Sequence, residues 1–197
     1  VNRNPFGQSD TPENVFYVGS QEVIAGELQM EYVGEQLAGK GKIAILMGIL
    51  SNEGAVKRTE GNEAVIADKY PDIEVLAKET GNWQRDQGLS ITENWLTAYG
   101  NDLNAILANN DEMALGALMA CQNADREDIL ILGVDAIPDA LDSIEEDGLT
   151  ATVLQDAVGQ GKGAVEAAHK ALKGESQEGI NWIPFKLVTK DNLAEFK

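Results

Sequence analysis

Five residues suited to binding hydroxyl groups follow predicted strands, each directly or after a short loop: Arg58, Trp83, Asn110, Asp135 and Gln155. A carboxylate accepts hydroxyl hydrogens, a guanidinium donates in a planar fork, and side-chain amides do both. An indole covers the C–H face of a sugar ring and keeps water away from it. This combination of side chains predicts a site for a neutral, polyhydroxylated ligand.

The same residue types also have a purely structural explanation. Asn and Asp are common at helix N-termini because their side chains cap backbone N–H groups. For a single residue this explanation would be the better one. Five coincident positions, one of them a tryptophan, favour a binding site instead.

Strand-like and helix-like stretches alternate along the chain. The continuous apolar runs at 42–48 and 129–134 are typical of strands buried on both faces. Further strands are predicted at 15–19, 73–77, 103–108, 150–154 and 182–188, and helices at 20–37, 55–70, 84–99, 111–123, 138–146 and 157–172. This alternation predicts an α/β fold with a doubly wound parallel sheet. Ligands bind such sheets at the carboxyl ends of the strands, where the five residues lie.

The composition limits the possible partners. The 197 residues carry 15 Lys+Arg against 33 Asp+Glu, a formal net charge of −18. A surface this negative repels phosphate backbones and anionic membranes, so we expect no nucleic-acid partner. No apolar run approaches the ~20 residues needed to span a bilayer.

The sequence contains no convincing enzyme motif. The stretch at 156–163 follows a strand and begins a helix, as a phosphate-binding loop does, but it lacks the first glycine and the magnesium-binding hydroxyl. With one histidine, His169, and one cysteine, Cys121, a zinc site is not expected. The acidic run at 139–147 is interpreted as a solvated helix face. We therefore predict a protein that is not an enzyme and has neither cofactor nor metal.

Four sequence blocks then identify a family. The stretches ANNDEMALGA (108–117), GVDAIPD (133–139), TVLQD (152–156) and KDNLAEF (190–196) resemble those of bacterial periplasmic monosaccharide-binding proteins, the ribose- and glucose/galactose-binding components of sugar ABC transporters. This resemblance implies two Rossmann-like lobes that are joined by three crossover strands and close on a sugar.

The resemblance also implies a set of ligand contacts. It includes Arg58, Trp83, Asn110, Asp135 and Gln155, and it adds Asn2 and Arg3 at the end of a strand of the N-terminal lobe. The loop at 51–54 lacks the His and Asp of galactose-type members, whereas Gln155 is ribose-like. The pocket is thus mixed, and the ligand is predicted only as a pentose or hexose. The connection near 39–41 is too short for the calcium loop of galactose-type members.

The family pattern implies a division into lobes. Residues 1–19 would be a remnant of the N-terminal lobe, residues 20–154 and 180–197 the C-terminal sugar-binding lobe, and residues 155–179 a hinge and a helix returning to the N-terminal lobe. Because the chain begins at Val1, we interpret it as processed or truncated. We accordingly expect a missing N-terminal lobe or a partner chain to complete the structure.

The predicted function is non-catalytic binding of a monosaccharide in an interlobe cleft and its delivery to the permease of an ABC importer. The resemblance implies a bacterial, extracytoplasmic location, in the periplasm or as a cell-surface lipoprotein. The alternative is the effector-binding domain of a LacI-type transcription regulator, although the net charge of −18 favours transport. A third hypothesis, an α/β enzyme, lacks a visible nucleophile–base pair.

Overall fold

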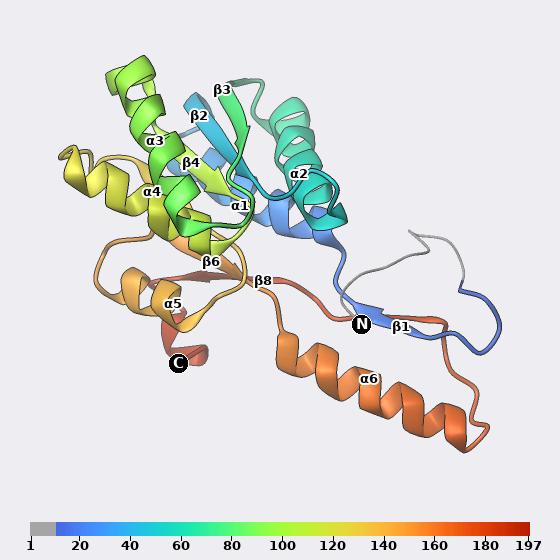
Figure 1. Ribbon diagram of the computed structural model, residues 1–197. Helices are drawn as coiled ribbons and strands as arrows, with labels where there is room; N and C mark the ends of the chain where they lie inside the picture. The colour runs from blue at the N-terminus through green and yellow to red at the C-terminus, as the bar shows by residue number, and fades with distance from the viewer. Residues whose placement is uncertain (1–10) are drawn as a thin grey trace. The chain divides into compact units, whose positions relative to one another are not determined.

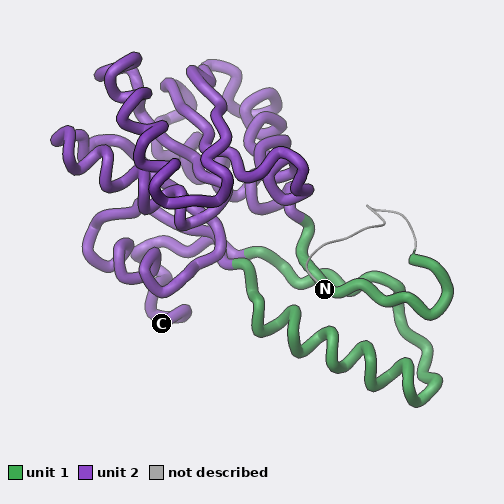
Figure 2. The backbone as a smooth tube through the Cα atoms, viewed as in Figure 1, with its two compact units in different colours: residues 1–21, 155–185 green, residues 22–154, 186–197 purple. Residues whose placement is uncertain are grey.

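The computed structural model describes residues 11–197 (Figure 1). The chain forms two compact units (Figure 2). The smaller consists of residues 1–21 and 155–185, and the larger of residues 22–154 and 186–197.

A six-stranded sheet forms the centre of the larger unit, in the order β3–β2–β4–β5–β6–β8. Its parallel strands are β2 (Lys40–Met47), β3 (Asp72–Thr80), β4 (Ala105–Ala108), β5 (Leu130–Leu132) and β6 (Ala151–Leu154). The edge strand β8 (Lys186–Thr189) pairs antiparallel with β6. The predicted α/β fold is confirmed, although the sheet is mixed because of β8.

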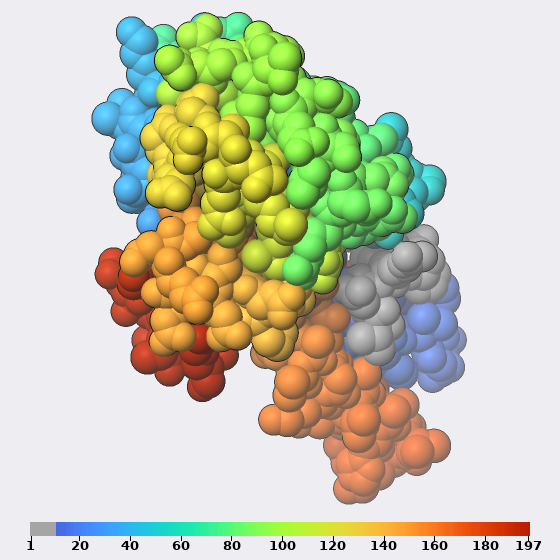
Figure 3. Space-filling view, turned by 60° about the vertical axis from the view of Figure 1, so that its left-hand side comes forward, coloured from blue at the N-terminus to red at the C-terminus, as the bar shows by residue number. Residues whose placement is uncertain are grey.

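Helices cover both faces of this sheet. One layer consists of α1 (Glu22–Gln36) and α2 (Glu53–Lys69), and the other of α3 (Arg85–Tyr99), α4 (Asp111–Asn123) and α5 (Pro138–Glu145). A separate hydrophobic core lies on each face of the sheet, and neighbouring residues of β4 point into different ones. Leu107 belongs to the same core as Met30 of α1, and Ile106 to the same core as Met113 of α4. Helices α3 and α4 lie side by side on the outside of the unit (Figure 3). Burial on both faces explains why the central strands are continuously apolar.

Two glycines allow α1 and α2 to pack with their backbones close together. A Cβ atom at Gly26 would lie 1.8 Å from the carbonyl oxygen of Arg58, and one at Gly61 would lie 2.2 Å from that of Val23. Any larger residue would push the helices apart. This close approach places the Arg58 side chain within reach of Glu22 at the start of α1.

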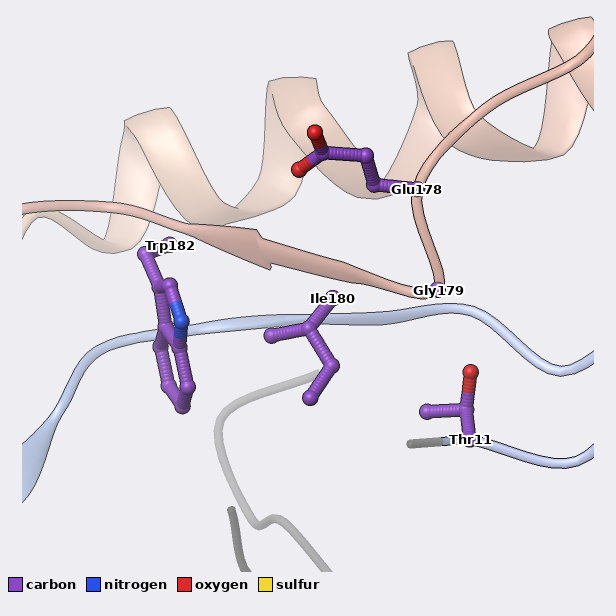
Figure 4. Close-up of a pocket in the computed structure, with 5 residues that line it drawn as sticks. All are labelled: Thr11, Glu178, Gly179, Ile180 and Trp182. Carbon is purple, nitrogen blue, oxygen red and sulfur yellow. The ribbon is translucent and has the colours of Figure 1, made fainter. Parts of the chain in front are cut away.

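The smaller unit contains a two-stranded parallel sheet of β1 (Tyr17–Gly19) and β7 (Ile180–Trp182), together with α6 (Ala157–Leu172). A pocket in this unit is lined by Thr11, Glu178, Gly179, Ile180 and Trp182. Figure 4 shows Ile180 and Trp182 extending to the same side of β7, as alternate strand residues do, while Glu178 points the other way. None of the predicted site residues within 11–197 lines this pocket.

The prediction of one strand at 182–188 was wrong. Residues 180–182 form β7 in the smaller unit, and residues 186–189 form β8 in the larger one. Pro184 lies between them, and a proline cannot donate to a strand ladder. Residues 180–185 lie in the smaller unit and residues 186–197 in the larger one. None of the helices within residues 11–197 is long and apolar enough to cross a membrane.

Candidate functional site

Four of the predicted site residues come together in the larger unit, each from a different element. Arg58 lies on α2, Trp83 precedes α3, Asn110 precedes α4, and Asp135 follows β5. Three contacts connect them. The Nη1 atom of Arg58 is 3.8 Å from Oδ1 of Asp135, its Cζ atom is 5.9 Å from the centroid of the Trp83 ring, and Nδ2 of Asn110 donates to the Trp83 carbonyl at 3.3 Å.

Arg58 is buried at the base of this group, with only 5% of its surface exposed. Its Nε donates to Oε2 of Glu22 at 2.8 Å, and its Nη1 donates to the carbonyl oxygen of Asn109 at 2.5 Å. The 3.8 Å separation from Asp135 is longer than a hydrogen bond. A ligand hydroxyl can bridge a gap of this size, because it accepts from the guanidinium and donates to the carboxylate.

Trp83 is held in an unusual backbone conformation. Its φ is 68°, and that of the preceding Asn82 is 52°. The indole packs against Gly48, where a Cβ atom would lie 2.2 Å from the ring. The nearby guanidinium of Arg58 is within cation–π range of the same ring. The half-buried indole thus offers a fixed, flat apolar surface next to the polar groups.

Asn110 has a structural role as well as a position in the site. Its Oδ1 accepts from the backbone N–H of Met113 at 3.1 Å, which caps α4, and its Nδ2 donates to Trp83. The structural explanation, that Asn and Asp side chains cap helix N-termini, is therefore correct for Asn110. Because a side-chain amide carries two N–H groups, binding of a hydroxyl is compatible with this role.

Asp135 is partly accessible, with 31% of its side chain exposed. Burial raises its pKa to about 7, and the neighbouring Asp111, Glu22 and Glu112 act in the same direction, while Arg58 lowers it. Burial likewise raises the pKa of Asp111, which is fully buried, to about 6. The site is thus rich in carboxylates gathered around one guanidinium.

Comparison with known proteins identifies the family. Residues 2–176 match the family described as the periplasmic binding protein domain. The chain belongs to that family. The resemblance inferred from the four sequence blocks is thereby confirmed.

Relatives of this periplasmic binding protein domain are themselves named as binding proteins. The chain is 46% identical to a putative rhizopine-binding protein of Rhizobium meliloti, over 100% of this chain and 64% of that protein. It is 36% identical to the ribose import binding protein RbsB of Escherichia coli, over 93% of this chain and 61% of that protein. An ABC transporter solute-binding protein of Bacillus halodurans, solved with bound myo-inositol, is 41% identical and has a TM-score of 0.85. This match covers 92% of this chain and 62% of that protein. The chain thus spans less than two thirds of each.

The three other predicted site residues are Gln155, Asn2 and Arg3. Gln155 lies in the smaller unit, where its carbonyl oxygen accepts from the N–H of Ala157 at 2.8 Å. Asn2 and Arg3 lie outside the described residues. Within residues 11–197, no three His, Cys, Asp or Glu side chains are arranged to hold a metal ion.

Two residues of the site were missed by sequence reasoning. Neither Glu22 nor Asp111 was among the predicted site residues. The Glu22 carboxylate pairs with Arg58. The Asp111 carboxylate contributes to the raised pKa of Asp135. The available signal for Asp111 was its position directly after a strand, next to Asn110, in a block shared with the family.

The raised pKa values predict how stability changes with pH. Asp135 and Asp111 have pKa values of about 7 and about 6 in the folded protein, above the ~3.9 of an unfolded chain. Between about pH 4 and 7 the folded state therefore binds more protons than the unfolded state, so these groups lower the free energy of unfolding as pH rises. We expect the stability of the wild type relative to Asp135→Asn to fall across this range in urea titrations. A difference that stays constant or increases would contradict these assignments.

Proposed function

We propose that this chain forms part of a solute-binding protein that captures a small, neutral, polyhydroxylated ring without chemically changing it. The ligand class is a monosaccharide or a cyclitol. The observation that carries the proposal is the Arg58–Asp135 pair beside the Trp83 indole, with a gap of 3.8 Å between the charged groups. A ring with hydroxyl groups at its edge and C–H groups on its face matches both surfaces.

The charges of the site favour a neutral ligand. The guanidinium of Arg58 is surrounded by the carboxylates of Glu22 and Asp135, and Asp111 lies nearby. An anionic ligand would meet this excess of negative charge, and a cationic one would compete with Arg58 for Asp135. Hydroxyl groups both donate and accept, so they can satisfy the guanidinium and the carboxylate together.

Family membership supports the wider role. The names of the relatives, a ribose import binding protein among them, support delivery of the ligand to the permease of an ABC importer. We propose an extracytoplasmic location in a bacterium, either in the periplasm or at the cell surface as a lipoprotein. We also propose that Asn2, Arg3 and Gln155 contact the ligand, and that a second lobe or a partner chain completes the cleft. No observation favours the transcription-regulator alternative.

Isothermal titration calorimetry on the intact natural protein tests this function. The panel is myo-inositol, D-ribose and D-galactose, with D-glucuronate as a charged control. We expect saturable binding of at least one neutral compound, with a dissociation constant in the micromolar range or below, and no binding of D-glucuronate. Absence of binding by all three neutral compounds, or preference for the anion, would contradict the proposal.

A further inference from the structure

The carboxylate of Asp111 lies behind the candidate site, with its full hydrogen-bonding capacity directed at the protein. Its Oδ1 accepts from the hydroxyl of Thr152 at 2.6 Å, and its Oδ2 accepts from the backbone N–H of Ile137 at 3.0 Å. The backbone N–H of Ala136 also stabilises the ionised form of this carboxyl and so lowers its pKa. Asp111 has no exposed surface, so its effect on a ligand must be transmitted through these groups.

The segment that Asp111 holds is the one that carries the ligand-facing carboxylate. Asp135 has a φ of 127° and Ala136 a φ of 59°, two consecutive residues other than glycine in a region that favours glycine. Such a backbone conformation is strained and persists only where its surroundings enforce it. The hydrogen bond from the Ile137 N–H to Asp111, directly after the turn, and the favourable effect of the Ala136 N–H on the same carboxylate provide this enforcement.

The neighbouring strands are shaped to admit this carboxylate. A Cβ atom at Gly133, at the end of β5, would lie 2.0 Å from Oδ1 of Asp111. Thr152, on β6, is fully buried and holds the same oxygen. The backbone N–H of Asp111 donates to the carbonyl of Val134 at 2.8 Å, which fixes α4 against the end of β5. Asp111 thus connects β5, β6, α4 and the turn at 135–136.

We propose that Asp111 is a positioning residue for ligand binding: it holds the Asp135–Ala136 turn in its left-handed conformation and so sets the Asp135 carboxylate against Arg58. This inference rests on the proposed function, in which Asp135 binds a ligand hydroxyl. A carboxylate at position 111 offers a charged acceptor oxygen to both Thr152 and the turn, whereas an amide is neutral and offers one acceptor oxygen to only one of them.

A double-mutant cycle on the intact natural protein tests whether Asp111 acts through Asp135. The variants are Asp111→Asn, Asp135→Asn and their combination, each titrated with whichever of myo-inositol, D-ribose and D-galactose binds the wild type most tightly. We expect Asp111→Asn to weaken binding at least tenfold in the wild-type background and less than twofold in the Asp135→Asn background. A purely structural role predicts equal losses in both backgrounds, and that result would overturn the proposal.

A second measurement is independent of the ligand. A carboxylate that acts on an amide N–H moves its proton resonance downfield, so in Asp111→Asn the amide protons of Ala136 and Ile137 should both move upfield. The matched control is Thr152→Val, which removes the hydrogen bond to Oδ1 of Asp111 but leaves the turn contacts. This control should retain both amide shifts and bind within about threefold of the wild type.

The possible outcomes separate the two proposals. If the wild type binds no neutral compound but the two amide shifts move, the proposed function fails and the effect of Asp111 on the turn stands. Unchanged amide shifts in Asp111→Asn overturn the positioning role whatever the ligand result. If Asp111→Asn does not fold, the cycle is repeated with Ala136→Gly in every variant, because glycine adopts the left-handed turn without strain. Failure of Asp111→Asn to fold in that background as well would also overturn the proposal.

Discussion

Replacing Asp135 with alanine is expected to weaken binding of a neutral polyol by about 100-fold or more, the loss typical of truncating one partner of a buried charge pair. The substitution removes the acceptor for a ligand hydroxyl. It also leaves the guanidinium of Arg58 without the carboxylate that lies 3.8 Å away. Calorimetric titration of the intact protein with the neutral compound that binds the wild type measures the effect.

Asp139 provides the matched control for this substitution. It lies four residues further on, its side chain is 63% exposed, and it pairs with Arg85 at 2.9 Å. Asp139→Asn should therefore bind within about twofold of the wild type, because exposed ion pairs contribute little. Wild-type affinity in Asp135→Ala would remove Asp135 from the site. An equal loss in both variants would indicate an effect of overall charge instead.

Replacing Arg58 with methionine is expected to abolish binding and to lower the free energy of unfolding by about 3–5 kcal/mol, the usual cost of breaking a buried ion pair from one side. Methionine preserves much of the side-chain volume but removes the guanidinium that pairs with the Glu22 carboxylate, whose side chain is 10% exposed. The Asn109 carbonyl also loses its donor. Urea unfolding and calorimetric titration measure the two effects.

Lys57, the preceding residue on α2, provides the control. Its side chain is 46% exposed and pairs with Glu60. Lys57→Met should change stability by less than about 1 kcal/mol and leave binding intact. Adding Glu22→Gln to Arg58→Met should recover part of the lost stability, since the buried carboxylate that has lost the Arg58 guanidinium is then replaced by a neutral amide. Stability and binding of Arg58→Met equal to those of Lys57→Met would show that the buried guanidinium is not central.

Much of the architecture could be predicted because its signals are local. The bounds of α4 and α6 were predicted correctly, as each helix begins directly after a capping residue, Asn110 or Asp156, whose side chain bonds to the first turn. The double-sided burial of the central strands was visible as continuous apolar runs. The rule that ligands bind at the carboxyl ends of parallel strands then brought Arg58, Trp83, Asn110 and Asp135 to one edge.

The remainder depended on contacts between distant parts of the chain. Glu22 and Arg58 are 36 residues apart, and their pairing follows from the close packing of α1 and α2, which the sequence shows only as the isolated glycines Gly26 and Gly61. Asp111 resembles any acid in the first turn of a helix, and only the left-handed turn at 135–136 distinguishes it. The separation of β7 from β8 depended on which strand each one pairs with, and single-strand patterns do not carry that information.

The most direct test of the central claim is a crystal structure of the intact protein with the bound neutral compound selected by calorimetry. We predict that ligand hydroxyls lie within hydrogen-bonding distance of Asp135 and Arg58, and that the Trp83 indole lies against the ring. A ligand bound elsewhere, or one held without contact to Asp135 and Arg58, would contradict the account.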